Sequence, residues 1–178
     1  EFREAAIAEF KNLRVKKSYI AIVKGIVSEE MKFNEPILTI KTKSGAFSKI
    51  SPNGKSAFSE VYPLMVSGKK SLVKVRIETG RTHQIRVHLS SINRHILGDH
   101  LYGFKSENAK ISRILLHAYL LYFIHPRSGK EVKICAGLPS EFLNFTTNQK
   151  VKDEIYEKIL PTNVERYFSD TSGWLRYV

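Results

Sequence analysis

Residues 71–88 read SLVKVRIETGRTHQIRVH. In the first half of this stretch, β-branched residues alternate with charged ones, which predicts a strand with one apolar and one polar face. Gly80 then permits a tight turn, and we expect a helix to begin near Thr82, a good N-cap residue. The stretch therefore predicts a junction from strand to helix. The expected buried stripe of that helix consists of Ile85, Leu89 and Ile92.

Polar groups gather at this junction. The unpaired N–H groups of a helix start favour an anion, and Arg81 adds a planar set of donors that suits a carboxylate or a phosphate. His83, Gln84 and Arg86 bring further polar groups to the same turns. The stretch predicts a binding site for a phosphate or a carboxylate. The alternative is a basic helix cap whose arginine pairs with a surface acid.

The remaining elements follow from hydrophobic spacing and from the positions of Pro and Gly. In chain order they are an amphipathic helix over 1–14 (apolar face Phe2, Ala6, Phe10 and Leu13), a strand over 18–27, short strands and turns over 29–70, strands over 119–124 and 131–135 around a hairpin loop, and one or two helices from Pro139 to Pro161. We therefore predict one α+β domain over 1–161 with a mixed, mainly antiparallel sheet flanked by helices, followed by a tail over 162–178.

The composition indicates a polyanionic partner. The chain of 178 residues carries 29 Lys and Arg against 17 Asp and Glu, a net charge of +12. Each cation that neutralises a phosphate releases a counterion, so RNA, DNA or an anionic membrane surface would fit. Cys135 is the single cysteine, which excludes an internal disulfide and favours a reducing, cytoplasmic setting. No metal site, membrane span or signal peptide is expected, and we expect a monomer.

The ten residues from Thr79 to His88, followed by Gly98-Asp99 and Tyr102-Gly103, resemble the strongest signature of the RluA-type RNA pseudouridine synthases. Four further segments resemble that family in the expected order. They are Val15–Gly25 (VKKSYIAIVKG), Gly54–Ala57 (GKSA), Leu115–Ala118 with His125-Pro126, and Leu138–Phe142 (LPSEF). The resemblance covers residues 1 to 145.

The resemblance implies a fold and a reaction. Enzymes of this family isomerise a uridine within ribosomal or transfer RNA, with an essential aspartate and without metal or cofactor. It implies that Arg81 pairs with that aspartate and that Tyr19 stacks on the target base and takes part in proton transfer. Leu116 would form an apolar floor under the base. The further candidates for RNA binding are His83, Gln84, Arg86, Lys16 and Lys17.

Several of these residues have simpler interpretations. Tyr19 and Leu116 also fit a hydrophobic core, and His88 and His117 are expected to be structural. Asp99, between Gly98 and His100, is interpreted first as a turn residue.

The sequence departs from the family pattern in one respect. The family's nucleophilic aspartate lies in a His-Arg-Leu-Asp segment ahead of the first helix, and no such segment precedes Glu1. We therefore expect the chain to be an N-terminally shortened, inactive part of an enzyme. A similar run at Arg166–Gly173 has Phe168 at the position of the aspartate and is interpreted as coincidence. The alternatives are a non-catalytic RNA-binding protein and a basic domain that binds no RNA.

Overall fold

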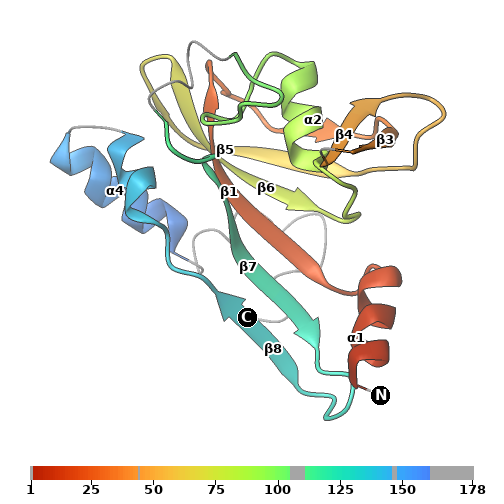
Figure 1. Cartoon of the computed structure of the whole chain (residues 1–178). Helices are drawn as coiled ribbons and strands as arrows, with labels where there is room; N and C mark the ends of the chain where they lie inside the picture. Colours follow the sequence, from red (N-terminus) through yellow and green to blue (C-terminus); the bar gives the residue numbers. More distant parts are fainter. Residues whose placement is uncertain (1, 44, 105–110, 146–147, 161–178) are drawn as a thin grey trace.

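The computed structural model describes residues 2–43, 45–104, 111–145 and 148–160. A six-stranded sheet forms the centre, with the strand order β2-β5-β6-β1-β7-β8 and antiparallel pairing throughout (Figure 1). A separate two-stranded hairpin consists of β3 and β4. The elements are α1 Phe2–Lys11, β1 Lys16–Lys24, β2 Met31–Phe33, β3 Ile37–Thr42, β4 Gly45–Ile50, β5 Ser59–Ser67, β6 Lys70–Ile77, α2 Gln84–Ser91, β7 Leu116–Ile124, β8 Glu131–Cys135, the 3₁₀ helix η1 Ser140–Phe145 and α4 Gln149–Ile159.

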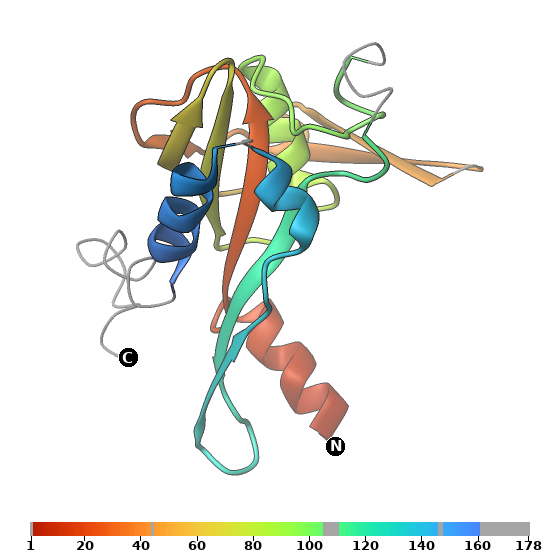
Figure 2. The same cartoon turned by 90° about the vertical axis from the view of Figure 1, so that its left-hand side faces the viewer.

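Helices cover the two faces of the sheet unequally. Figure 2 shows η1 and α4 on one face, while α2 lies against the opposite face. The first face buries Ile20 and Ile22 of β1 against Phe142 and Ile155. The second face has its own apolar cluster, and its members include Ala21, Val23, Val73, Val75, Ile85 and Leu89. The predicted α+β class with a mainly antiparallel sheet is confirmed.

The strand predicted around residues 71–79 is β6, which pairs with β1 on one side and β5 on the other. Its polar face is buried as well as its apolar face. Lys74 is fully buried, and Arg76 forms an ion pair with the buried Glu60 at 3.1 Å. The predicted strand is therefore confirmed, but both of its faces are covered because the strand lies inside the sheet with helices on either side.

Helix α2 differs from the prediction at both ends. It begins at Gln84, and its N-cap residue is His83, so the assignment of Thr82 as the N-cap is wrong. Ile85 and Leu89 are buried as expected, but Ile92 follows the last turn and is 37% exposed. The turn after Gly80 is longer than the sequence indicated, so the helix begins two residues later than predicted. Its first two residues, Gln84 and Ile85, are both buried.

A helix is found at the N-terminus as predicted, but it ends at Lys11, so Leu13 of the predicted apolar face lies outside it. None of its residues is buried, and Phe2, Phe10 and Leu13 of the predicted apolar face are about half exposed. Arg14 pairs with Glu9 through two hydrogen bonds. The hairpin loop at residues 125–130 and the helices after Pro139 are found where they were predicted. The predicted tail, with the run at Arg166–Gly173, lies outside the described residues.

Candidate functional site

The loop between β6 and α2 is fixed by the side chain of Gln84. The Oε1 atom accepts hydrogen bonds from the Arg81 backbone N–H at 2.9 Å and from the Thr79 hydroxyl at 2.8 Å. The Nε2 atom donates to the Phe58 carbonyl at 2.8 Å and lies 3.0 Å from the Ser59 hydroxyl. All of these contacts are within the protein, and Gln84 is buried. Its amide therefore determines where the loop lies, and it is not presented to a ligand.

Arg81 lies in this loop with its guanidinium at the wall of a cavity. Its Nε donates a hydrogen bond of 2.9 Å to the carbonyl of Ser56, which orients the side chain. It forms no ion pair with an acid in the described parts of the chain. A guanidinium that is held in place without a carboxylate partner can bind an added anion through two parallel hydrogen bonds.

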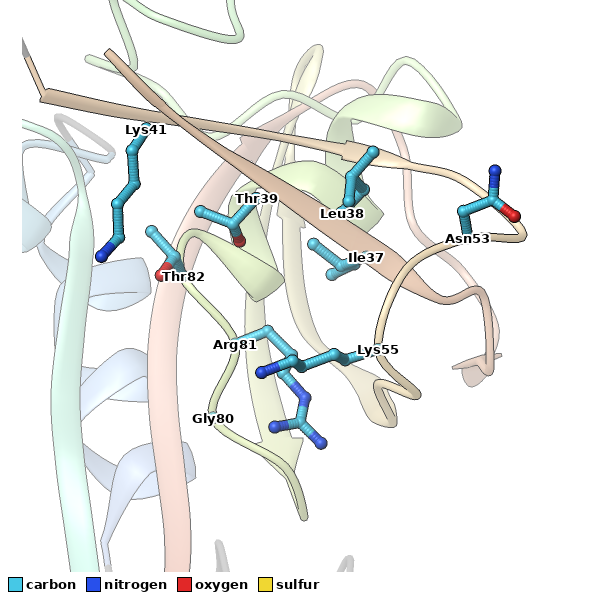
Figure 3. A pocket seen from close by; sticks show the side chains of 9 residues that line it. All are labelled: Ile37, Leu38, Thr39, Lys41, Asn53, Lys55, Gly80, Arg81 and Thr82. Atoms are coloured by element: carbon cyan, nitrogen blue, oxygen red, sulfur yellow. The ribbon is translucent and has the colours of Figure 1, made fainter. Parts of the chain in front are cut away.

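The cavity beside Arg81 has a volume of about 430 Å³. Figure 3 shows it between β3, the turn that carries Asn53 and Lys55, and the loop of Gly80 and Arg81. It is lined by Ile37, Leu38, Thr39, Lys41, Asn53, Lys55, Gly80, Arg81 and Thr82. Three of these residues are cations and none is an acid. The cavity is therefore suited to an anionic ligand.

Arg86, five residues after Arg81, forms a bidentate pair with Asp99. Its Nε and Nη2 atoms donate to the two carboxylate oxygens of Asp99 at 2.9 and 2.8 Å. Asp99 is 1% exposed, and its Oδ1 also accepts hydrogen bonds from the backbone N–H groups of Leu101 and Tyr102. Burial opposes the charge of Asp99, but the bonds from Arg86, Tyr102 and Leu101 outweigh it and lower the pKa of the carboxyl. The interpretation of Asp99 as a turn residue is confirmed.

His83 connects α2 to the β3–β4 hairpin. Its backbone has φ 56°, a left-handed conformation that is uncommon outside glycine. Its Nδ1 lies 2.9 Å from the hydroxyl of Tyr102, which also accepts the backbone N–H of Ser48 in β4. Burial and the positive charge of Arg86 lower the pKa of His83, which favours the neutral ring.

Tyr19 and Leu116 lie on the same face of the sheet as α2. Tyr19 is in β1 and Leu116 begins β7, and both pack against the apolar cluster that contains Ile85 and Leu89. Tyr19 also lines a hollow of about 230 Å³ between β1, β7 and β8. Burial raises the pKa of its phenol, so the hydroxyl keeps its proton at neutral pH. Neither residue lines the cavity of Arg81.

Lys16 and Lys17 point to opposite faces of β1, since they are adjacent in a strand. Lys17 is buried and donates a hydrogen bond of 3.2 Å to the carbonyl of Glu78, at the start of the site loop. Lys16 lies over the ring of Tyr122. Burial lowers the pKa of both lysines, with Arg76 adding to the effect at Lys16.

The two histidines interpreted as structural have protein partners. His88 is buried, stacks on Phe33, and lies within hydrogen-bond distance of the Ser59 hydroxyl and the Glu35 carbonyl. His117 lies 3.2 Å from the carbonyl of Ala136. The described residues contain no group of three His, Cys, Asp or Glu side chains able to hold a metal ion. In the same part of the chain, no helix is long and apolar enough to cross a membrane.

Sequence reasoning did not identify Lys41 or Lys55 as site residues. Both line the cavity of Arg81, although 40 and 26 positions separate them from it in the chain. Lys55 belongs to the Gly54–Ala57 segment, which could have drawn attention to it. Lys41 had no such signal, because it looks like any exposed lysine of a strand.

Three comparisons bear on this arrangement. The family model for RNA pseudouridylate synthase matches residues 1–91. An uncharacterized RNA pseudouridine synthase of Helicobacter pylori strain J99 is 49% identical over 142 residues, covering 80% of this chain and 55% of that protein. The ribosomal large subunit pseudouridine synthase D of Haemophilus ducreyi is 32% identical over 167 residues, covering 84% of this chain and 51% of that protein.

A solved structure agrees with the sequence relatives. The human RNA pseudouridylate synthase domain containing 1 superimposes with a TM-score of 0.66 at 25% identity, covering 85% of this chain and 70% of that one. The matches make up 55% and 51% of the two sequence relatives. The chain thus spans about half the length of each. The region that the family model matches, residues 1–91, includes β1, β6 and the loop of Arg81.

Proposed function

The chain belongs to the RNA pseudouridylate synthase family, and on this premise we propose that the protein isomerises uridine to pseudouridine within RNA. In this reaction the N-glycosidic bond of a uridine breaks and the same base is rejoined to the ribose through carbon. The base has to leave the stack and enter the protein, at a cost of a few kcal/mol.

One observation carries the proposal. The Arg81 guanidinium is oriented by the Ser56 carbonyl, lines a cavity, and has no acidic partner among the described residues. We propose that it pairs with the nucleophilic aspartate, which lies outside the described residues. The ion pair would keep that carboxylate ionised and would fix its direction toward the ribose or the base.

Tyr19 and Leu116 are proposed to hold the extruded base. The two lie on the face of the sheet that α2 covers, the side on which the Arg81 loop connects to the helix. An aromatic ring offers a stacking surface, and an apolar side chain beneath the base excludes water. Since burial keeps the Tyr19 phenol protonated, it can donate a hydrogen bond or a proton to the base as the glycosidic bond breaks.

The other predicted residues have supporting roles in this proposal. Gln84 and the Arg86–Asp99 pair fix the loop and helix that carry Arg81. His83 holds the hairpin through Tyr102. Lys16, Lys17 and Arg86 were predicted to contact the RNA backbone. Because Lys17 and Arg86 already have protein partners, we propose that they contribute positive potential at the surface more than direct bonds.

The substrate is proposed to be RNA of the large ribosomal subunit, with transfer RNA as the second possibility. Support comes from the net charge of +12 and from relatives that carry ribosomal large subunit names. We further propose that the enzyme acts as a monomer in the cytoplasm and requires neither metal nor cofactor.

The test is a gene deletion combined with mapping of pseudouridine in ribosomal and transfer RNA. We expect one or a few uridines to remain unmodified in the deletion strain and to be modified again when the full reading frame is restored. Loss confined to transfer RNA would move the substrate to the second possibility. A deletion strain with every pseudouridine of the wild type would contradict the function.

A further inference from the structure

We propose that the cavity between β3 and the Arg81 loop binds an RNA backbone phosphate next to the target uridine, with Lys55 and Lys41 as its ligands. The proposal rests on the proposed function and adds a substrate-binding site to it. Neither Lys41 nor Lys55 is among the residues that the sequence predicts to contact RNA.

Lys55 is placed by its backbone. The N–H and carbonyl of Lys55 both pair with Ile37 of β3, each at 2.9 Å. The preceding residue, Gly54, lies so close to β3 that an added Cβ would come within 2.4 Å of the Ile37 carbonyl carbon. Only a glycine allows this approach, and it fixes the start of the Lys55 side chain at the edge of the cavity.

Arg81 is placed by the same segment. Its Nε donates to the carbonyl of Ser56, the residue after Lys55. One short stretch of chain therefore brings two cations to one cavity, and Lys41 approaches from β3 on the other side (Figure 3). No carboxylate lines this cavity. Cations that share a site without an acid repel one another, and an anion bound between them removes that cost.

The charge of the site indicates a second anion in addition to the proposed aspartate. An aspartate beside Arg81 would neutralise one of the three lining cations and leave Lys41 and Lys55. A phosphodiester carries one negative charge and several acceptor oxygens, and lysine binds it as a point charge. The hydroxyl of Thr82 and the amide of Asn53 line the same cavity and can donate further hydrogen bonds.

The position of the cavity indicates which phosphate it binds. The cavity shares Arg81 with the proposed reaction site, while Tyr19 and Leu116 lie outside it. In the proposed function the base lies against Tyr19, so the phosphate that we assign to the cavity is that of the target nucleotide or of a neighbour. The polar lining fits a backbone group better than a second base.

The experiment compares three variants of the full-length protein, Lys55→Met, Lys41→Met and the control Lys49→Met. Lys49 is exposed, lies in β4 of the same hairpin, and does not line the cavity, so its variant loses the same charge elsewhere. The probe is a short uridine-containing hairpin RNA, and its affinity is measured over a series of salt concentrations. Each cavity variant should bind about tenfold more weakly, and its salt slope should fall by about one. The control should change much less.

The outcomes separate this site from the proposed function. Normal salt slopes in both cavity variants, or an equal change in Lys49→Met, would overturn the phosphate site even if the parent protein makes pseudouridine. If the cavity variants have reduced salt slopes but the parent protein makes no pseudouridine, the phosphate site is supported and the proposed enzyme activity is rejected. In an active parent, the cavity variants should raise KM and leave kcat near that of the parent. A fall in kcat with KM unchanged would contradict a role in binding.

Discussion

Arg81 and Arg86 belong to the same ten-residue stretch, Thr79 to His88, but their guanidinium groups have different partners. Arg86 bonds to both carboxylate oxygens of Asp99 and lies over the ring of Tyr102 at 4.8 Å. Arg81 has one carbonyl partner, Ser56, and faces a cavity without an acid. The first arginine is bound to an acid within the protein, and the second is held at the cavity wall with no acidic partner among the described residues.

The difference shows how similar side chains can be sorted by their contacts. An arginine bound to both oxygens of an acid has fewer donors left for a ligand, whereas an oriented arginine without an acid is a candidate for chemistry. The same reasoning applies to Gln84, whose amide is engaged on both sides within the protein. Substitutions in the two environments should therefore affect different quantities, stability at Arg86 and Asp99 and turnover at Arg81.

The largest expected effect is on turnover, from Arg81→Ala in the full-length protein. We predict a loss of about a thousandfold in kcat, because the nucleophilic carboxylate loses the group that orients it. Stability should change by about 1 kcal/mol or less, since one part-exposed hydrogen bond is lost. Pseudouridine formation and urea unfolding measure the two quantities. A fully active variant would remove Arg81 from the mechanism.

Asp99→Asn should act on stability. It leaves Arg86 without its acid in a mostly buried site, and we predict a loss of about 3 kcal/mol in the free energy of unfolding, measured with urea. The pKa of Asp99 is lowered in the folded chain. Its contribution is therefore complete above the ordinary aspartate pKa, near 4, and is lost as the pH falls through the lower folded value. The parent should lose stability in that acid range more steeply than Asp99→Asn; parallel curves would contradict the assignment.

Tyr19→Phe tests the phenol hydroxyl without removing the ring. We predict unchanged RNA affinity and a fall in kcat of about a hundredfold, because stacking persists while proton transfer is lost. Single-turnover assays of pseudouridine formation would measure the rate, and Tyr19→Leu would report on the ring. If Tyr19→Phe reacts at the parent's rate, the hydroxyl has no role in the reaction.

The smallest effect is expected for Gln84→Leu. The substitution removes the bonds to the Arg81 backbone and to the Thr79 hydroxyl. Stability should fall by about 2 kcal/mol, since buried partners are left unsatisfied. Turnover should fall by about tenfold because Arg81 is less well placed. Urea unfolding and pseudouridine formation measure the two quantities; a turnover equal to that of the parent in folded Gln84→Leu would contradict the positioning role.

Much of the fold could be predicted from local patterns. Alternation gave β6, the Pro and Gly positions gave the hairpin between β7 and β8, and periodic apolar residues gave α1. The start of α2 was misplaced because Thr82 looks like a cap in isolation. In the fold, the loop is held by the amide of Gln84, a contact across the junction that propensity does not contain.

The candidate site was only partly accessible to sequence reasoning. Arg81 could be identified because its neighbours in the chain carry the signal. Lys41 could not, because it reaches the cavity only through the placement of the β3–β4 hairpin beside the Arg81 loop. The same limit applied to Arg86, whose acid, Asp99, lies 13 positions further along the chain. Contacts between distant segments decide which cations are available to a ligand.

The most direct test of the central claim is the distance from the Arg81 guanidinium to the nearest carboxylate in a crystal structure of the full-length protein. We predict an aspartate oxygen within hydrogen-bond distance, about 3 Å, contributed by a segment outside the residues described above. A guanidinium that still contacts only the Ser56 carbonyl, with no carboxylate within reach, would contradict the account.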